Sequence, residues 1–329
     1  MLLNDYQARS VELLIYPGFK SFEAIGPITV FTYANRILKS MGCPEAYEIE
    51  IRSTSIGPIP SDTLMSLQAT KDLSTECRSH SVLIVGAHEI SEAVKLNPEI
   101  TQWIRQYAPT TARFAALCSG AFFLASAGLL NGRRATTHWR MREDFAKQFP
   151  EVDLDIDSIY VREDKFWTSA GVSASIDLSL AFIEEDLGHQ LALAVAQDLV
   201  IFLKRPGGQS QFSSNLVSQK TQNSAMRETQ EWILANLDQK MSVALMAERA
   251  SMSTRHFTRI FTKEVGMCPS EFLDQSRIDQ ARRLLSGGTL PLKTVSFMSG
   301  FTSSDHMRLA FKKFLSVTPK EYRDRFTKT

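Results

Sequence analysis

The sequence predicts an α/β N-terminal domain followed by an all-α C-terminal domain. Between Val11 and Phe202, short apolar runs alternate with segments of helical period, a pattern typical of βα units around a mainly parallel sheet sandwiched by helices. Beyond Phe202 the strand-like runs stop, and from Ala225 onward the chain reads as short helices separated by Gly, Ser and Pro. A chain of 329 residues is also too long for one ordinary core.

The domain boundaries follow from these two patterns. The stretch between them is rich in Ser, Gln, Gly and Asn and has hardly any apolar periodicity, which indicates a linker. We therefore place the N-terminal domain at residues 1–205, the linker at 206–224 and the C-terminal domain at 225–329. The expected strands of the first domain are VELLIYP, YEIEIRS, VLIVGA, ARFAALC and FWTSA, and its first expected helix is FEAIGPITVFTYANRIL.

Composition and charge narrow the function classes. With 43% hydrophobic and 22% charged residues, the chain has the composition of an ordinary folded protein. The net charge of +1 conceals an asymmetry, because residues 1–210 carry 19 Lys and Arg against 25 Asp and Glu, whereas residues 211–329 carry 18 against 11. A basic C-terminal half favours binding to a polyanion, since Lys and Arg displace counterions from phosphates.

Cysteine usage and hydropathy lead to several expected absences. The four cysteines are scattered and form no CxxC pair, which indicates neither a disulfide framework nor a zinc site. We expect no metal and no cofactor. The first residues lack the pattern of a signal peptide, and no uncharged apolar run approaches the roughly 20 residues of a spanning helix. The expected setting is the cytoplasm, without membrane contact.

The C-terminal domain contains an internal repeat with an offset of fifty residues. The offset aligns Phe261 with Phe311, Lys263 with Lys313, Pro269 with Pro319, Glu271 with Glu321 and Phe272 with Tyr322. Upstream of each copy lies a short helical segment and a tight turn, and the second turn has one extra residue. The repeat therefore predicts two helix-turn-helix units.

The second helix of each unit has a capping residue and two unlike faces. Ser253 and Ser303 can cap these helices by accepting hydrogen bonds from backbone N–H groups. The packing faces contain Phe257, Ile260 and Phe261 in the first copy and Met307, Ala310 and Phe311 in the second. We expect DNA contacts from Thr254, Arg255, His256 and Arg259 in the first helix and from Ser304, Asp305, Arg308 and Lys312 in the second. The alternative is that these polar side chains form an ordinary solvated face.

The C-terminal domain resembles the AraC/XylS family. The resemblance is carried by RASMSTRHFTRIFTKEVGMCPSEFLDQSRIDQARRLL and by GFTSSDHMRLAFKKFLSVTPKEYRDRF. It implies that a long helix at about Pro269–Leu285 connects the two units, and that both recognition helices enter successive major grooves of double-stranded DNA. The segment Ser296–Met298 departs from the small residues more usual at that place.

A cysteine follows one of the predicted strands of the first domain. In ARFAALCSGAFF, Cys118 stands between the strand-like RFAAL and the small residues that open an apolar helix, as in a strand–nucleophile–helix elbow. A helix N-terminus at this point would lower the pKa of the Cys118 thiol, and the backbone N–H groups that follow could bind an anion or a carbonyl group.

The first domain resembles the PfpI-type branch of the class I glutamine amidotransferase-like superfamily, and the whole chain resembles the GlxA-type regulators. The resemblance implies a flavodoxin-like sheet. It makes Cys118 the elbow cysteine, Glu23 the acid that approaches it and His138 the histidine beside the pocket, while Gly86 and Ala87 belong to a loop that supplies a further backbone donor. The expected effector-pocket residues are Glu23, Gly86, Ala87, Cys118, Ser119 and His138.

This architecture predicts a transcription regulator that is not an enzyme. We expect a small-molecule effector, and amino acids and quaternary amines are candidates because His138, Trp139, Phe19 and Phe22 could offer aromatic faces to a cation; the same aromatics can equally be core residues. We also expect a homodimer that forms through the N-terminal domain and binds paired half-sites, and the resemblance implies transcription activation and contact with RNA polymerase. Two alternatives stay open: hydrolase or amidase-like activity at Cys118, and a DNA-binding protein without a sensing role.

Overall fold

The chain divides into two compact units, Met1–Arg205 and Pro206–Thr329. The computed structural model describes residues 8–203, 209, 224–286, 290–315 and 317–327. Almost all of the stretch 206–224, which the sequence analysis assigns to a linker, lies outside the described residues. No helix of the described residues is both long enough and apolar enough to cross a membrane.

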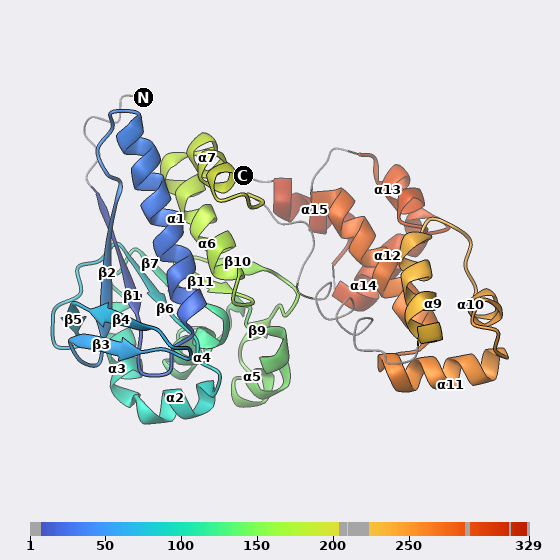
Figure 1. Ribbon diagram of the computed structural model, residues 1–329, viewed down its shortest axis with the longest axis horizontal. Coiled ribbons are helices and arrows are strands. Elements are labelled where there is room, and N and C mark those ends of the chain that lie inside the picture. Colours follow the sequence, from blue (N-terminus) through green and yellow to red (C-terminus); the bar gives the residue numbers. More distant parts are fainter. Residues whose placement is uncertain (1–7, 204–208, 210–223, 287–289, 316, 328–329) are drawn as a thin grey trace. The chain divides into compact units, whose positions relative to one another are not determined.

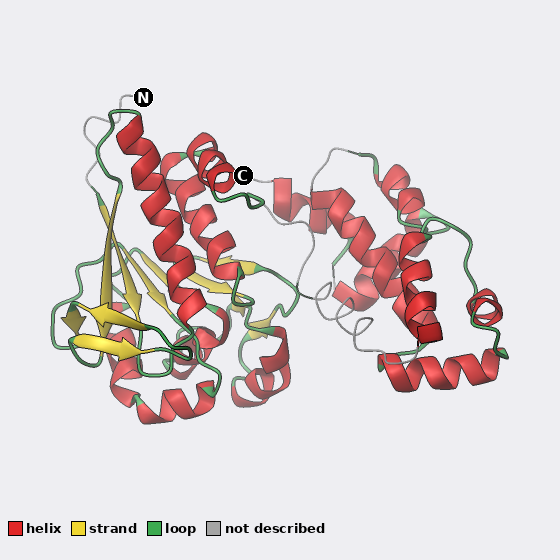
Figure 2. Cartoon of the chain, in the orientation of Figure 1, coloured by secondary structure: helices red, strands yellow, loops and turns green. Residues whose placement is uncertain are grey.

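The first unit is built on a seven-stranded sheet with helices on both faces (Figures 1 and 2). The strands lie in the order β10-β11-β7-β6-β1-β2-β5, and every neighbouring pair is parallel except β10 with β11. These strands are β1 (Arg9–Leu14), β2 (Tyr47–Ser53), β5 (Lys71–Asp72), β6 (Ser81–Ile84), β7 (Arg113–Ala116), β10 (Tyr160–Glu163) and β11 (Phe166–Ser169). The expected α/β class with a mainly parallel sheet is confirmed.

Two further strand pairs lie outside this sheet. The strands β3 (Gly57–Pro60) and β4 (Ser66–Ala69) form an antiparallel hairpin. The strands β8 (Arg134–Ala135) and β9 (Asp153–Leu154) form a short parallel pair.

The helices of the first unit form two layers, one on each side of the sheet. The first layer consists of α1 (Ser21–Ser40), α6 (Ala174–Leu187) and α7 (His189–Asp198), and the second of α2 (Ile90–Leu96), α3 (Pro98–Tyr107), α4 (Ala121–Ser126) and α5 (Arg142–Gln148). Alternate residues of β1 serve the two layers, since Leu13 packs with the first and Leu14 with the second. Short 3₁₀ turns at Cys118–Gly120 (η2) and Trp139–Met141 (η3) precede α4 and α5.

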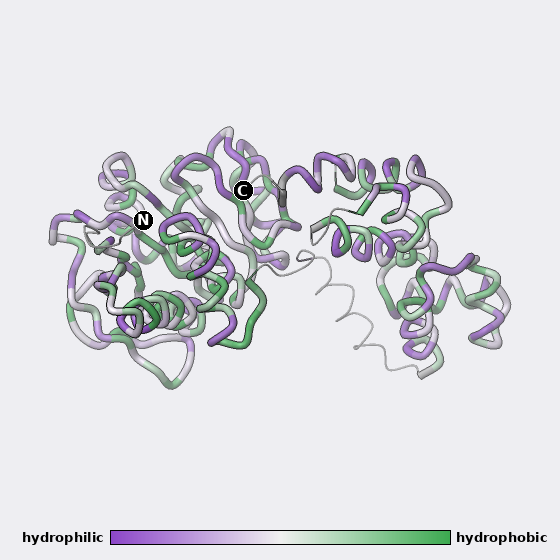
Figure 3. Tube along the Cα trace, turned by 90° about the horizontal axis from the view of Figure 1, so that it is seen from above, coloured by the Kyte–Doolittle hydropathy of each residue, from purple (hydrophilic) through white to green (hydrophobic). Residues whose placement is uncertain are grey.

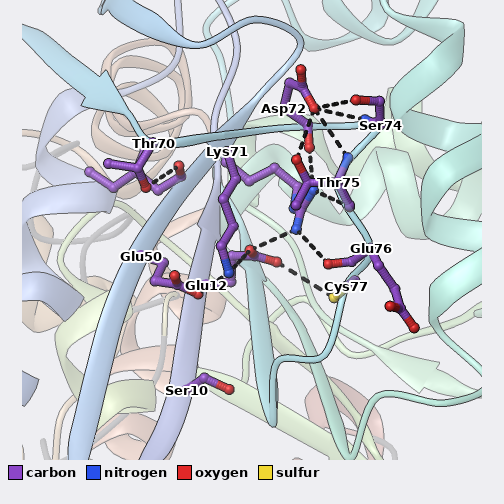
Figure 4. Close-up of polar contacts among 12 residues, drawn as sticks. Ser10, Glu12, Glu50, Thr70, Lys71, Asp72, Ser74, Thr75, Glu76 and Cys77 are labelled. Atoms are coloured by element: carbon purple, nitrogen blue, oxygen red, sulfur yellow. Dashed lines mark hydrogen bonds and ion pairs between the residues drawn. The ribbon is translucent and has the colours of Figure 1, made fainter.

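A buried ion pair fastens one edge of the sheet (Figure 4). Glu12 on β1 and Arg52 on β2 are both fully buried, and Arg52 Nη2 lies 2.9 Å from Glu12 Oε1. Lys71 of β5 lies 3.8 Å from the same carboxylate oxygen, and the Cys77 thiol donates to Glu12 Oε2 at 3.5 Å. Arg52 also donates to the Thr75 carbonyl at 2.7 Å. The cluster holds β5 and the loop after it against β1 and β2.

The second unit is all-helical and has two apolar cores that share one long helix. Its helices are α9 (Ser224–Ala235), α10 (Val243–Arg249), α11 (Thr254–Val265), α12 (Pro269–Ser286), α13 (Leu292–Met298), α14 (Ser304–Leu315) and α15 (Pro319–Thr327). Phe272 and Leu273 of α12 belong to the core of α9, α10 and α11, whereas Ile278, Ala281 and Leu285 belong to the core of α13, α14 and α15. In Figure 3 hydrophilic and hydrophobic segments alternate along the tube through the helices of this unit, as expected where each turn of an amphipathic helix has a polar side and an apolar side.

The internal repeat is visible as a repeated aromatic contact. Phe261 meets Phe272 edge-to-face with ring centroids 5.5 Å apart, and fifty residues later Phe311 meets Tyr322 edge-to-face at 5.8 Å. The two expected helix-turn-helix units are thus present, and the connecting helix α12 extends one residue beyond the predicted end.

Candidate functional site

The N-termini of α11 and α14 are capped as the sequence predicts. The Ser253 hydroxyl accepts a hydrogen bond from the His256 backbone N–H at 3.4 Å, and the Ser303 hydroxyl accepts one from the His306 N–H at 3.1 Å. Phe257 and Phe261 on α11, and Met307, Ala310 and Phe311 on α14, are buried, while Ile260 is half-buried. The opposite face of each helix is left for solvent or a partner.

The outer face of α11 carries a continuous stripe of hydroxyl and cationic side chains. A shallow groove along it is lined by Thr254, Arg255, Thr258, Arg259, Thr262 and Lys263. Three of the four residues of α11 that were expected to contact DNA therefore lie together. The fourth, His256, is exposed beside them, with its Nδ1 3.4 Å from Arg259 Nη2. Thr258, Thr262 and Lys263 were not among the expected contacts. Each follows an expected contact or another groove residue by three or four positions, a helical spacing that the sequence alone shows.

The outer face of α14 offers different chemistry. Asp305 and Arg308, both expected DNA contacts, form an ion pair with 3.3 Å between Arg308 Nε and Asp305 Oδ1. Lys312 is exposed, whereas Ser304 is half-buried with its hydroxyl 3.5 Å from that of Ser296 on α13. Leu309, which was not among the expected contacts, is 58% exposed on this face.

In the first unit, Cys118 lies at a strained turn between β7 and α4. Its φ of +54° is the left-handed conformation that L-residues with a side chain rarely adopt. Its carbonyl oxygen accepts a hydrogen bond from the Thr137 hydroxyl at 3.0 Å, and its backbone N–H donates to the Ser169 hydroxyl at 3.4 Å. A Cβ on the nearby Gly120 would approach the Ile84 carbonyl oxygen to 2.7 Å, so the turn requires glycine there. The strand–cysteine–helix elbow is present.

Four of the other expected pocket residues meet at this turn. The Gly86 backbone N–H donates to Glu23 Oε2 at 2.8 Å. The Ser119 hydroxyl donates to the Ala87 carbonyl at 2.8 Å and accepts from the Ala87 N–H at 3.1 Å. A Cβ on Gly86 would lie 2.5 Å from Ser119 Oγ and 2.9 Å from Glu23 Oε2, so only glycine fits between them.

These contacts correct one expectation about the loop at Gly86. Its backbone donors were expected to serve a bound molecule, but the Gly86 and Ala87 N–H groups already donate to Glu23 and Ser119. The Gly120 N–H donates to the Leu117 carbonyl at 2.8 Å. The loop therefore orders the cysteine turn, and all three donors, two from the loop and one from the turn, serve the chain itself.

Lys20 is the functional candidate that the sequence analysis missed. Its residue is 8% exposed, and its Nζ lies 3.5 Å from Cys118 Sγ and 3.5 Å from Glu23 Oε1. Burial opposes the charged form, but the neighbouring Cys118 and Glu23 outweigh it and raise the pKa of Lys20, so its ammonium group stays charged. Only its place three residues before Glu23 hinted at this role.

The ionisation of the elbow differs from the expected one. Burial, reinforced by the nearby Glu23 charge, raises the pKa of the Cys118 thiol well above its usual value, instead of lowering it as a helix N-terminus would. The helix α4 spans only six residues, so its dipole is small. Burial also raises the pKa of Glu23 to about 7, against the opposing effects of Lys20 and the Gly86 N–H. At neutral pH the thiol is protonated and Glu23 is close to half-ionised.

His138 stands at the edge of this group. Burial, together with the charges of Lys20 and Arg140, lowers its pKa to about 4, so the imidazole is neutral near pH 7. Its Nδ1 accepts a hydrogen bond from the Arg140 backbone N–H at 3.3 Å. Among the contacts of the described residues, no hydrogen bond joins His138 to Cys118.

The aromatic residues considered for a cationic ligand are placed differently from one another. Phe19 is fully buried in the core, whereas Phe22 is 53% exposed. The Trp139 ring stacks on His138 and carries the Arg140 guanidinium 5.1 Å from its centroid. Within the described part of the chain, no group of three or more His, Cys, Asp or Glu side chains could hold a metal ion.

The chain combines an α/β unit that has a buried cysteine turn with two capped helix-turn-helix units. This combination places it in the class of DNA-binding regulators that carry a separate α/β domain. Comparison with known proteins agrees. Residues 9–185 match the DJ-1/PfpI family, and residues 246–325 match a helix-turn-helix domain. The chain belongs to the DJ-1/PfpI family and, through both domains, to the AraC-type transcription regulators of the GlxA group.

Individual relatives are similar to different shares of the chain. The chain is 31% identical over 246 residues to the HTH-type transcriptional regulator ArgR of Pseudomonas aeruginosa, covering 74% of this chain and 73% of that protein. It is 28% identical over 283 residues to the HTH-type transcriptional regulator GlxA of Rhizobium meliloti, covering 85% and 86%. An isonitrile hydratase of Pseudomonas putida is 24% identical over 193 residues, covering 58% and 78%. A ThiJ/PfpI family protein from Pseudomonas syringae has the same fold, with a TM-score of 0.53 at 19% identity over 82% of this chain and 90% of that one.

Proposed function

We propose that this transcription regulator binds paired DNA half-sites as a homodimer and responds to a small effector held beside Cys118. The observation that carries the effector site is the buried ammonium group of Lys20, 3.5 Å from both Cys118 Sγ and Glu23 Oε1. Charged groups are rarely buried unless they are paired or bind a ligand, because desolvation opposes the charged form. Transcription activation, contact with RNA polymerase and a cytoplasmic setting are part of the same proposal.

The charge of Lys20 favours effectors that carry an anionic group. A carboxylate could pair with the ammonium group in place of the half-ionised Glu23. A quaternary ammonium group at the same place would meet a like charge, and the Phe19 ring is not accessible to it. We therefore rank amino acids and other small carboxylates above quaternary amines that lack a carboxylate.

We propose that Cys118 does not catalyse a reaction. A cysteine nucleophile needs a thiolate and an adjacent base. Here burial raises the pKa of the thiol, and the neutral His138 makes its described hydrogen bond with the Arg140 backbone. The strained elbow geometry is the feature that keeps hydrolase or amidase chemistry as a second candidate.

A thermal-shift screen of the full chain tests the effector site. Amino acids, other small carboxylates and choline are compared on the wild type, on Lys20→Met and on Lys147→Met, an exposed lysine of α5 that serves as the matched control. We expect a carboxylate to raise the unfolding temperature of the wild type and of Lys147→Met, but not of Lys20→Met. Each hit is then incubated with the wild type and with Cys118→Ala, recovered and analysed chemically. A hit consumed only when Cys118 is present would establish the enzymatic alternative, and the absence of any hit among carboxylates would contradict the proposed effector class.

DNA footprinting and analytical ultracentrifugation test the homodimer. We expect a dimer in the absence of DNA and a protected region that contains two related half-sites. A monomer that protects one half-site would contradict this part of the proposal. Run-off transcription with purified RNA polymerase, with and without the effector found in the screen, then tests activation.

A further inference from the structure

Leu309 lies at the centre of the outer face of α14. The helices α11 and α14 span Thr254–Val265 and Ser304–Leu315, so the offset of fifty residues holds along their whole length and places Leu309 at the position of Arg259. Arg259 lines the groove on α11. Leu309 is 58% exposed, whereas Met307, Ala310 and Phe311 are at most 7% exposed. Leu309 therefore belongs to the face that meets DNA and contributes little to the core.

The chemistry of a leucine side chain limits what it can recognise in a DNA groove. It can neither donate nor accept a hydrogen bond, so it gains nothing from phosphates or from the polar edges of bases. The apolar group that base pairs present in the major groove is the 5-methyl group of thymine. Burial of that methyl group against Leu309 would be favourable through the hydrophobic effect.

We propose that Leu309 is a specificity-determining residue that recognises the 5-methyl group of a thymine in the part of the half-site read by α14. The inference rests on DNA binding by the second unit and extends it to one residue and one base. The equivalent residue of the first repeat, Arg259, has the opposite preference, because a guanidinium group pairs with the O6 and N7 acceptors of guanine. At equivalent positions the two repeats thus select different bases.

The neighbours of Leu309 keep it available for this contact. Asp305 lies one turn earlier on the same face and pairs with Arg308 at 3.3 Å, so these two charges already have each other as partners. Lys312, three residues after Leu309, is exposed and can contact a phosphate at the groove edge.

Replacement of thymine by uracil tests the inference, because it removes the methyl group and leaves every hydrogen-bonding group in place. The full chain first selects its preferred duplex from a randomised pool, and its affinity for that duplex is measured with each thymine in turn replaced by uracil. We expect about a fourfold loss of affinity at one thymine in the part of the half-site bound by α14, the factor that corresponds to one buried methyl group. Leu309→Ala should bind the unmodified duplex more weakly and should not lose affinity further when that thymine is replaced.

Two control variants separate this contact from a general effect. Arg259→Ala removes the equivalent side chain of α11, and Leu245→Ala removes a leucine of α10 that is 39% exposed. Both should retain the full sensitivity to uracil at the identified thymine. Equal affinity of the wild type for all uracil-containing duplexes would overturn the inference, and so would an undiminished uracil effect in Leu309→Ala; both would leave DNA binding intact. Failure of the full chain to select any sequence would instead contradict sequence-specific DNA binding itself.

Discussion

Arg277 donates from Nε to the backbone carbonyl oxygen of Leu237 at 3.1 Å and thereby ties the connecting helix α12 to the end of the α9 segment. Its Nη2 also donates to the Gln239 carbonyl at 2.8 Å. Gly300, in the turn of the second helix-turn-helix unit, packs against the same Leu237 carbonyl. The two helix-turn-helix units are thus in contact here, where a buried guanidinium group and a glycine leave no free space.

Gly300→Ala should destabilise the second helix-turn-helix unit by at least about 2 kcal/mol. The new Cβ would overlap the Leu237 carbonyl oxygen and approach Arg277 Nε, and φ is +79°. The matched control is Gly266→Ala, which has a φ of +81° but no neighbouring atom within 4 Å, and which should cost only about 1 kcal/mol. Calorimetric scans of the full chain check both values, and equal destabilisation by the two variants would contradict the role assigned to the Leu237 carbonyl.

Arg255→Ala and Arg308→Ala should each weaken binding to the preferred duplex by about 1–3 kcal/mol if the side chain reads a base. Lys312→Ala should weaken binding about equally on all duplexes. It should also lower the magnitude of the slope of log affinity against log salt concentration by about 1, as expected for the loss of one phosphate contact. Fluorescence anisotropy at several salt concentrations distinguishes these effects. Lys147→Ala, which removes an exposed cation from the first unit, is the control for net charge. Unchanged affinity of both arginine variants would contradict the assignment of the recognition helices.

The titration of Glu23 should make folding stability depend on pH. Its pKa is raised to about 7 in the folded chain, so between its usual pKa and pH 7 the folded state binds more protons than the unfolded state. The contribution of Glu23 to the free energy of unfolding is therefore greatest in acid and decreases as the pH rises to about 7, by up to about 3 kcal/mol. Glu23→Gln removes this dependence. Urea unfolding is measured at pH 5 and at pH 8. From the lower to the higher pH, the free energy of unfolding of the variant should increase relative to that of the wild type. A difference between the two proteins that is the same at both pH values would rule out the raised pKa.

Cys118 should react slowly with iodoacetamide at pH 7.5. Its thiol is fully buried and its pKa is raised, whereas Cys43 and Cys268 are partly exposed. Mass spectrometry of time points should show Cys43 and Cys268 modified well before Cys118. The rate at Cys118 should increase steeply once the chain is unfolded in urea. Preferential modification of Cys118 in the folded chain would indicate a thiolate and would favour the enzymatic alternative.

Much of the fold could be predicted because it depends on local pattern. The apolar runs around Leu13, Ile49, Val82, Phe114 and Trp167 became β1, β2, β6, β7 and β11. The strands β5, β10 and the β3–β4 hairpin were missed, since they are short and carry polar or proline residues. The position of β5 depends on the contacts of Lys71 with Glu12 and Glu50, which no local pattern reveals.

The candidate sites show the same division. Cys118 and Glu23 could be found from motifs, and the capped helices α11 and α14 from their period. Lys20 could not, because its importance comes from burial beside groups 3 and 98 residues away in the sequence. The pKa of Cys118 was expected to change in the wrong direction for the same reason: a sequence shows the start of a helix, but not the extent of desolvation.

The chemical difference between α11 and α14 gives the DNA-bound chain a polarity. One chain would contact two unlike base sequences in a fixed order, so its half-site has no internal two-fold symmetry and the chain can lie along the duplex in one direction only. Two copies on neighbouring half-sites could then be arranged head-to-head or head-to-tail, and the order of the recognised bases alone would reveal which. The difference between Leu309 and Arg259 would thus give the repeated fold a single orientation along the bound duplex.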